Sequence, residues 1–159
     1  MTAPCRLDGQ TVLISGAGGG IGASLVQAFR DAGAKVSGAD QDTGMLAHLD
    51  LDNSVTFDLA DANATSAAIS ALLAEHGKHN IIVSIAGFTR DETLDHLHNA
   101  SWTSELAMNL NGAYELTAAI VASKPERGWA NRAITSAVTG LAQYGTLVAC
   151  TNSAGLSPQ

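Results

Sequence analysis

Short, strongly apolar runs alternate along the chain with longer segments in which apolar residues recur every three or four positions. The short runs are rich in Val and Ile and have the length of buried strands. The longer segments have the spacing of one helix face. The pattern predicts strands at 11–14, 35–39, 55–57, 81–85 and 133–137, and helices at 23–30, 63–76, 101–123 and 146–156. Strands that alternate with helices predict a parallel sheet with helices on both faces, the α/β doubly wound class.

A glycine-rich turn joins the first predicted strand to the first predicted helix. Residues 15–22 read Ser-Gly-Ala-Gly-Gly-Gly-Ile-Gly. Glycine leaves no Cβ to hold off a ligand, and the following helix offers free N–H groups and a positive dipole end, which suit a pyrophosphate. A P-loop is excluded because no Lys-Ser or Lys-Thr follows the last glycine. The alternative is a flexible glycine loop without a ligand.

The spacing of Gly16, Gly20 and Gly22 is G-x-x-x-G-x-G. It resembles the opening of the short-chain dehydrogenase/reductase (SDR) family, Thr-Gly followed by three variable residues and Gly-Ile-Gly. Ser15 replaces the Thr, and Ile21 is kept. The resemblance implies a Rossmann-type sheet of about five strands in the order 3-2-1-4-5. It also implies a single domain over residues 1–159. The residues of this motif that the resemblance assigns to dinucleotide binding are Ser15, Gly16, Gly20, Ile21 and Gly22.

Asp40 ends the second predicted strand, 18 residues (40 − 22) beyond Gly22. A carboxylate there accepts hydrogen bonds from both hydroxyls of an adenosine ribose and repels a 2′-phosphate. Gly19 stands where many NADP-using relatives carry Arg. Both features predict NAD rather than NADP as the cofactor. A second role for Asp40, compatible with the first, is the N-cap of a short helix at 43–49.

Two further segments resemble cofactor-binding parts of the family. Asp58 and Leu59 stand in a Phe-Asp-Leu-Ala-Asp phrase, similar to the segment in which an Asp side chain and the next backbone group hold the adenine amino group. The alternative for Asp58 is an ordinary strand-end cap. Ser-Ile-Ala-Gly at 84–87 replaces the usual Asn-Asn-Ala-Gly. Ala86 and Gly87 still let the backbone pass close to the nicotinamide ribose.

The resemblance leaves two residues of catalytic type. Asn109 matches the Asn that, in relatives, bends the helix and binds the water linking the catalytic Lys to solvent. Its alternative is a side chain satisfied by the carbonyl four residues earlier. Ser136 matches the Ser that holds the substrate oxygen in one of two alignments, whereas the other alignment places Ala137 there. The helix that carries Asn109 is predicted to be capped by Ser101, with Glu105 near its first turn.

The proton-transferring Tyr and Lys of the family are missing. The Lys should lie four residues after the Tyr, so that one helix turn brings them together. Two alignments place Cys150 or Ala149 at the Tyr position and Ala154 or Ser153 at the Lys position. Acid–base catalysis contributes roughly 10²- to 10⁴-fold in rate. The sequence therefore predicts an impaired NAD-dependent oxidoreductase for a small alcohol or ketone, or alternatively a non-enzymatic dinucleotide-binding or interaction module.

Composition narrows the expected partners. The net charge of −7 argues against nucleic acid and anionic membranes. No apolar run has the length of a transmembrane helix, and two cysteines fit a reducing cytoplasm. His96 and His98 lie two apart, too poorly placed for a metal site. Family members are longer, so we expect the C-terminal part of the fold to be missing, with the edge beside the fifth strand unpaired and a homo-oligomer as the result.

Overall fold

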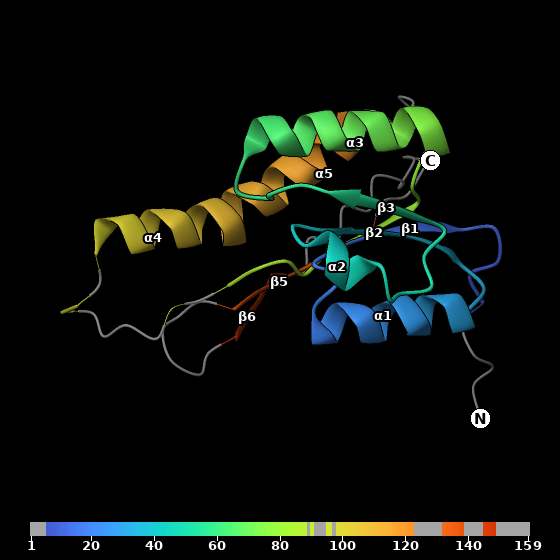
Figure 1. The fold of residues 1–159 in the computed structure, drawn as a ribbon, viewed down its shortest axis with the longest axis horizontal. Helices are drawn as coiled ribbons and strands as arrows, with labels where there is room; N and C mark the ends of the chain where they lie inside the picture. Colours follow the sequence, from blue (N-terminus) through green and yellow to red (C-terminus); the bar gives the residue numbers. More distant parts are fainter. Residues whose placement is uncertain are drawn as a thin grey trace, which may run out of the picture.

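The computed structural model describes residues 6–88, 90, 95–96 and 98–122, together with the backbone of 132–138 and 145–148. The strands are β1 (Thr11–Ser15), β2 (Lys35–Asp40), β3 (Asn53–Thr56), β4 (Ile81–Ser84), β5 (Arg132–Val138) and β6 (Gly145–Val148). The helices are α1 (Gly20–Asp31), α2 (Thr43–Leu46), α3 (Ala62–His76), α4 (Asn99–Leu106), the π-helix η1 (Ala107–Gly112) and α5 (Ala113–Ala122). Figure 1 shows their arrangement.

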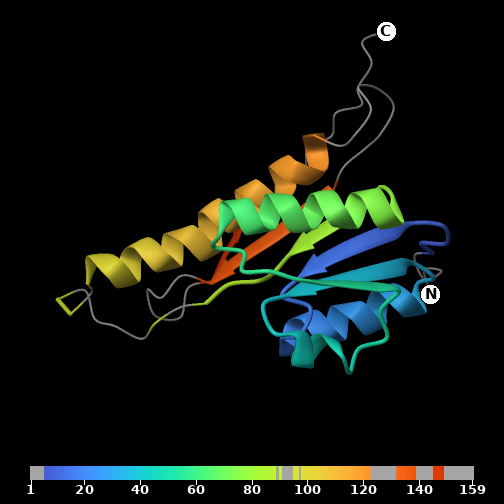
Figure 2. The same cartoon turned by 45° about the horizontal axis from the view of Figure 1, so that its top comes forward.

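The strands form one sheet in the order β3-β2-β1-β4-β5-β6. The first five are parallel to their neighbours, while β6 runs antiparallel to β5. Helices α1 and α2 cover one face of the sheet, and α3 and α5 cover the other, as Figure 2 shows. The predicted α/β doubly wound class and the strand order 3-2-1-4-5 are therefore confirmed.

Alternation along β1 builds a separate core on each face of the sheet. Val12 and Ile14 pack on the side of α1 and α2, whereas Leu13 packs on the side of α3 and α5. All three side chains are fully buried. Successive side chains of a strand point to opposite faces, so a strand that is apolar throughout needs helices on both sides. This arrangement leaves the carboxyl ends of the strands as the open edge of the fold.

The prediction for the C-terminal segment is wrong in two respects. Residues 145–148 form strand β6, not the start of a helix. The edge beside β5 is not unpaired, because β6 pairs with β5 from Thr135 to Val138. The physical reason is the connection, since only a few residues separate the two strands and a parallel return needs a dozen or more. The rest of the predicted helix lies outside the described residues.

The helix predicted from Ser101 starts earlier and is not uniform. It begins at Asn99 after His98, whose backbone is still extended (φ −88°, ψ 145°), so the prediction of Ser101 as the cap is wrong. The π-helix η1 interrupts it between α4 and α5. A π-helix inserts a residue into the helical turn and re-aims the side chains around it. Asn109 lies within this segment.

Candidate dinucleotide-binding site

In the glycine turn after β1, Gly16 and Gly22 lie too close to other backbone atoms to carry a Cβ. Gly16 has φ +74°, and a Cβ on it would lie 2.7 Å from the backbone N of Ala86. A Cβ on Gly22 would overlap the carbonyl oxygen of Gly16. These two positions bring β1, the turn and the end of β4 into direct backbone contact.

Gly20 differs from these two glycines, because among the described residues nothing beyond its chain neighbours and its own helix backbone lies within 4 Å of where its Cβ would be. It is the first residue of α1, and the neighbouring Ile21 is 70% exposed. In the described structure no side chain caps α1, and its first turn holds no acidic residue. The end of α1 therefore offers N–H groups beside open space, the arrangement that binds phosphate at helix N-termini.

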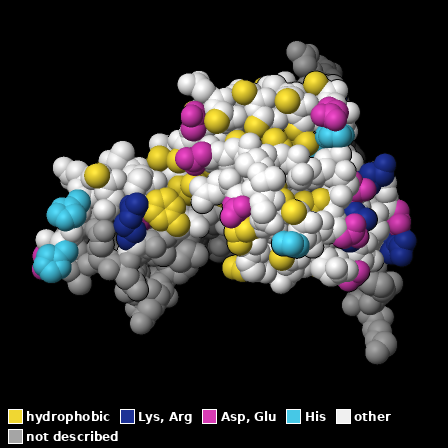
Figure 3. Space-filling view, viewed as in Figure 1, with side chains coloured by type: hydrophobic (Ala, Val, Ile, Leu, Met, Phe, Trp, Pro, Cys, Tyr) yellow, Lys and Arg dark blue, Asp and Glu magenta, His cyan; other side chains and the backbone are white. Residues whose placement is uncertain are grey.

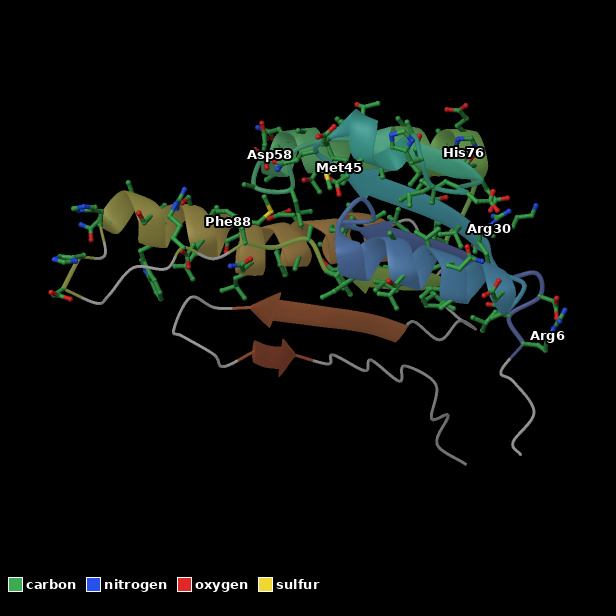
Figure 4. The ribbon with its side chains drawn as sticks, turned by 60° about the horizontal axis from the view of Figure 1, so that its bottom comes forward. Arg6, Arg30, Met45, Asp58, His76 and Phe88 are labelled. Carbon is green, nitrogen blue, oxygen red and sulfur yellow. The ribbon has the colours of Figure 1, made fainter. Side chains whose placement is uncertain are left out.

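An open cleft of about 250 Å³ lies at the carboxyl ends of β1, β2 and β4. Six predicted site residues line it, namely Ser15, Gly16, Asp40, Leu59, Ala86 and Gly87. Gly20, Ile21, Gly22, Asp58 and Asn109 are outside the lining. Figure 4 shows Met45, Asp58 and Phe88 at this end of the molecule, and Arg6, Arg30 and His76 at the other. Ligands of open α/β sheets bind at this edge.

The carboxylate of Asp40 is held in place by the backbone around it. Its Oδ2 accepts a hydrogen bond from the N–H of Gly18 at 3.0 Å, and its Oδ1 accepts one from the N–H of Asp42 at 3.2 Å. The residue that caps α2 is Asp42, whose side chain accepts from Gly44, so the N-cap alternative for Asp40 is wrong. Each oxygen of Asp40 retains acceptor capacity toward the cleft.

Asp58 makes the contact of a local cap. Its Oδ1 accepts from the N–H of Ala60 at 2.9 Å, and the residue is exposed. Asp61, not Asp58, caps α3, accepting from the N–H groups of Asn63 and Ala64. The adenine-binding role of Asp58 stays a prediction, while Leu59 beside it is buried in the cleft wall.

Asn109 ties the π-helix to the segment that follows β4. Its Nδ2 donates to the carbonyl of Phe88 at 2.7 Å, and its Oδ1 accepts from the N–H of Phe88 at 3.0 Å. The alternative, in which the Asn109 side chain hydrogen-bonds to the carbonyl four residues earlier in its own helix, is wrong. A Cβ on Gly87 would lie 2.6 Å from Oδ1 of Asn109, so the small residue is needed here.

The two predicted serines, Ser15 and Ser136, lie in β1 and β5, which β4 separates in the sheet. The hydroxyl of Ser15 donates to that of Ser84 at 3.2 Å, joining β1 to β4 inside the sheet. Ser136 lies in β5, paired through its backbone with Leu147 of β6, and its side chain is outside the described structure. So are the alternative Tyr and Lys positions at 149–150 and 153–154.

Several cleft residues were not predicted from the sequence. They are Gly19, Ala39, Gln41, Met45, Phe57, Ile85, Phe88 and Met108. Gln41 and Phe88 directly follow predicted site residues, so their position in the sequence was an available signal. Met45 and Met108 come from helices and carry no such signal.

In the described residues there is no group of three or more potential metal ligands and no helix able to span a membrane.

The chain matches known proteins over most of its length. The sequence family described as short chain dehydrogenase matches residues 10–154. D-threitol dehydrogenase of Mycolicibacterium smegmatis is 34% identical over 123 residues, which cover 72% of this chain and 47% of that protein. 2-Keto-3-deoxy-L-fuconate dehydrogenase of Xanthomonas campestris is 31% identical over 128 residues, covering 80% of this chain and 42% of the relative.

Solved structures agree with the sequence relatives. A gluconate 5-dehydrogenase from Burkholderia cenocepacia, in complex with NADP and tartrate, superposes with a TM-score of 0.68 at 28% identity, covering 75% of this chain and 50% of the other. The structure of gox2181 gives a TM-score of 0.69 at 25% identity, with 76% and 50% covered. This chain spans about half the length of the relatives it matches. The fold, the glycine turn and these matches show that the chain belongs to the short-chain dehydrogenase/reductase family.

Proposed function

We propose that this chain binds a nicotinamide dinucleotide at the carboxyl edge of its sheet and prefers NAD to NADP. Asp40 carries the preference, since its carboxylate lies in the cleft with both oxygens oriented by backbone N–H groups. A negative charge there accepts from ribose hydroxyls and repels a 2′-phosphate. No Lys or Arg side chain lines the described cleft to offset that repulsion. A solved relative was determined in complex with NADP, so membership of the family does not decide between the two cofactors, and the proposed preference depends on Asp40.

The test is calorimetric titration of the protein with NADH and with NADPH. We expect NADH to bind more tightly by at least about tenfold, or roughly 1.4 kcal/mol. Asp40→Asn keeps an oxygen that can accept from the N–H of Gly18 but removes the charge. In this variant the difference in affinity between NADH and NADPH should become smaller. Equal affinities in the unmodified protein, or a preference for NADPH, would remove Asp40 from this role.

The proposed chemistry is hydride transfer with an alcohol or ketone, in an impaired form. Bound NAD supplies the hydride acceptor. The α1 N-terminus would hold the pyrophosphate, Asp40 the adenosine ribose, and Ser136 the substrate oxygen. No Tyr-x-x-x-Lys occurs in the chain, so no phenol acidified by a lysine on the same helix is available to move the proton. We therefore expect cofactor binding without turnover at ordinary enzyme rates.

The second candidate is a non-enzymatic dinucleotide-binding module that acts by association. The absence of the Tyr-x-x-x-Lys pair supports this candidate. A second support is a set of four large side chains that are exposed on α4, η1 and α5, namely Trp102, Leu110, Tyr114 and Val121. Exposed apolar residues grouped on one helical segment favour self-association. Assaying the protein with a panel of alcohols and ketones separates the two candidates. Turnover at ordinary enzyme rates would rule out the non-enzymatic module.

A further inference from the structure

We propose that Glu105 is a positioning residue that fixes the wall of the cleft facing the nicotinamide half of the dinucleotide. The proposal rests on the proposed dinucleotide binding and deepens it. Glu105 belongs to no motif of the sequence and was placed only near the first turn of a helix. In the structure it is the one carboxylate among the buried residues of the described chain.

The carboxylate of Glu105 holds the backbone of the segment after β4. Its Oε1 accepts a hydrogen bond from the N–H of Arg90 at 2.9 Å, and only 9% of the residue is exposed. Burying a carboxylate is costly unless it is hydrogen-bonded, and a bond from N–H to an ionised acceptor is stronger than a neutral one. The hydrogen bond to the N–H of Arg90 therefore explains why a carboxylate can be buried at this position.

Glu105, near the end of α4, acts together with Asn109, four residues later in η1, which follows α4 directly. Residues four apart in a helix lie on one side of it, and both of these side chains reach the same segment. Asn109 takes the N–H and the carbonyl of Phe88, and Glu105 takes the N–H of Arg90. Three hydrogen bonds from one helix therefore fix two backbone positions just beyond the carboxyl end of β4.

The side chain of Arg90 closes this arrangement. Its Nη1 donates to the hydroxyl of Ser104 at 2.7 Å, and its Cζ lies 4.9 Å from the centre of the Phe88 ring. A guanidinium at that distance from an aromatic face is attracted to it. Figure 3 shows a basic side chain beside a hydrophobic ring on the part of the surface near α4. The ring of Phe88 is thus held from both its backbone and its face.

The position of this wall decides which half of the ligand it affects. Phe88 and Met108 line the cleft on the β4 side together with Ala86 and Gly87, whereas Asp40 and its neighbours line it on the β2 side. The proposed adenosine contacts come from the β2 side. Loosening Phe88 and Arg90 should therefore weaken binding of a ligand that reaches the β4 side, and leave a ligand confined to the β2 side and the glycine turn unchanged.

The experiment compares NADH with ADP, which lacks both the nicotinamide and its ribose, by calorimetry on Glu105→Ala, Glu105→Gln and the unmodified protein. In Glu105→Ala we expect NADH to bind at least about tenfold more weakly and ADP to bind within about twofold of its normal affinity. Glu105→Gln retains an oxygen acceptor for Arg90 and should restore most of the NADH affinity. Glu115→Ala is the matched control, because it removes a carboxylate from the adjoining helix α5 without a described contact to Phe88 or Arg90.

The outcomes separate this proposal from the proposed function. If Glu105→Ala binds NADH normally, or loses affinity for NADH and ADP equally, Glu105 does not position the nicotinamide side and the inference is overturned while dinucleotide binding stands. An unmodified protein that binds neither ligand would overturn both. Retained ADP binding in Glu105→Ala also shows that the variant is folded, so a selective loss of NADH affinity supports the positioning role.

Discussion

Gly20 and Gly22 both belong to the glycine motif, yet the structure gives them different reasons to be glycine. A Cβ on Gly22 would overlap Gly16 and lie 2.7 Å from the Cα of Ala17, and neither backbone group can swing away. A Cβ on Gly20 would meet no other described part of the protein within 4 Å, apart from its chain neighbours and its own helix backbone. Substituting each by alanine therefore separates the requirement of the fold from the requirement of the ligand.

The magnitudes follow from these contacts. For Gly22→Ala, overpacking against backbone costs roughly 3 kcal/mol, the upper part of the usual range. The better helix propensity of alanine within α1 offsets about 1 kcal/mol of this. The net loss of about 2 kcal/mol should lower Tm by roughly 4–8 °C for a chain of this size. For Gly20→Ala the overpacking is absent, so Tm should stay the same or rise slightly. Its affinity for NADH should nevertheless fall at least about tenfold, because the new methyl group occupies the space meant for the pyrophosphate.

The assay is thermal unfolding followed by circular dichroism, with NADH titration of each folded variant. The reasoning predicts that Gly20→Ala is a stable protein that binds poorly. A Gly20→Ala variant that binds NADH as well as the unmodified protein would refute the placement of the pyrophosphate at the α1 N-terminus. A Gly22→Ala variant with an unchanged Tm would refute the account of the turn's packing.

Three further predictions concern residues near the cleft and at the start of α3. Asn109→Ala removes both hydrogen bonds to Phe88 and leaves its N–H and carbonyl without their partner, so unfolding should become easier by about 1–3 kcal/mol; an unchanged Tm would mean that the tie contributes nothing. Asp61→Ala removes the cap of α3 and should cost about 1 kcal/mol in thermal unfolding while leaving NADH affinity unchanged. If Asp58 binds adenine, Asp58→Ala should lower the affinity for NADH with little change in Tm. A lower Tm with unchanged NADH affinity would mean that Asp58 is only a local cap.

The fold could be predicted where local pattern and long-range structure agree. The strand at residues 11–14 is apolar throughout because it is covered on both faces, and this fixes it as a central parallel strand. The β5–β6 hairpin was missed because the four residues of β6 are too few for periodicity to distinguish strand from helix. The π-helix η1 was missed because it depends on how the surrounding helix packs, which apolar spacing does not encode.

The candidate site divides in the same way. The positions of Gly16 and Asp40 in the cleft lining were predictable because both residues lie at the carboxyl end of a strand. Met45 and Met108 reach the cleft from helices whose packing angles the sequence does not reveal. Glu105 was misread as a residue near a helix start because a buried carboxylate has no sequence signature; only its hydrogen bond to Arg90 shows its position.

The most direct measurement is the crystal structure of the protein with NADH. It should show the pyrophosphate against the N–H groups at the start of α1, beside Gly20, and the adenosine ribose hydroxyls on the carboxylate of Asp40. A dinucleotide bound elsewhere, or one whose phosphates lie away from the glycine turn, would contradict the central claim.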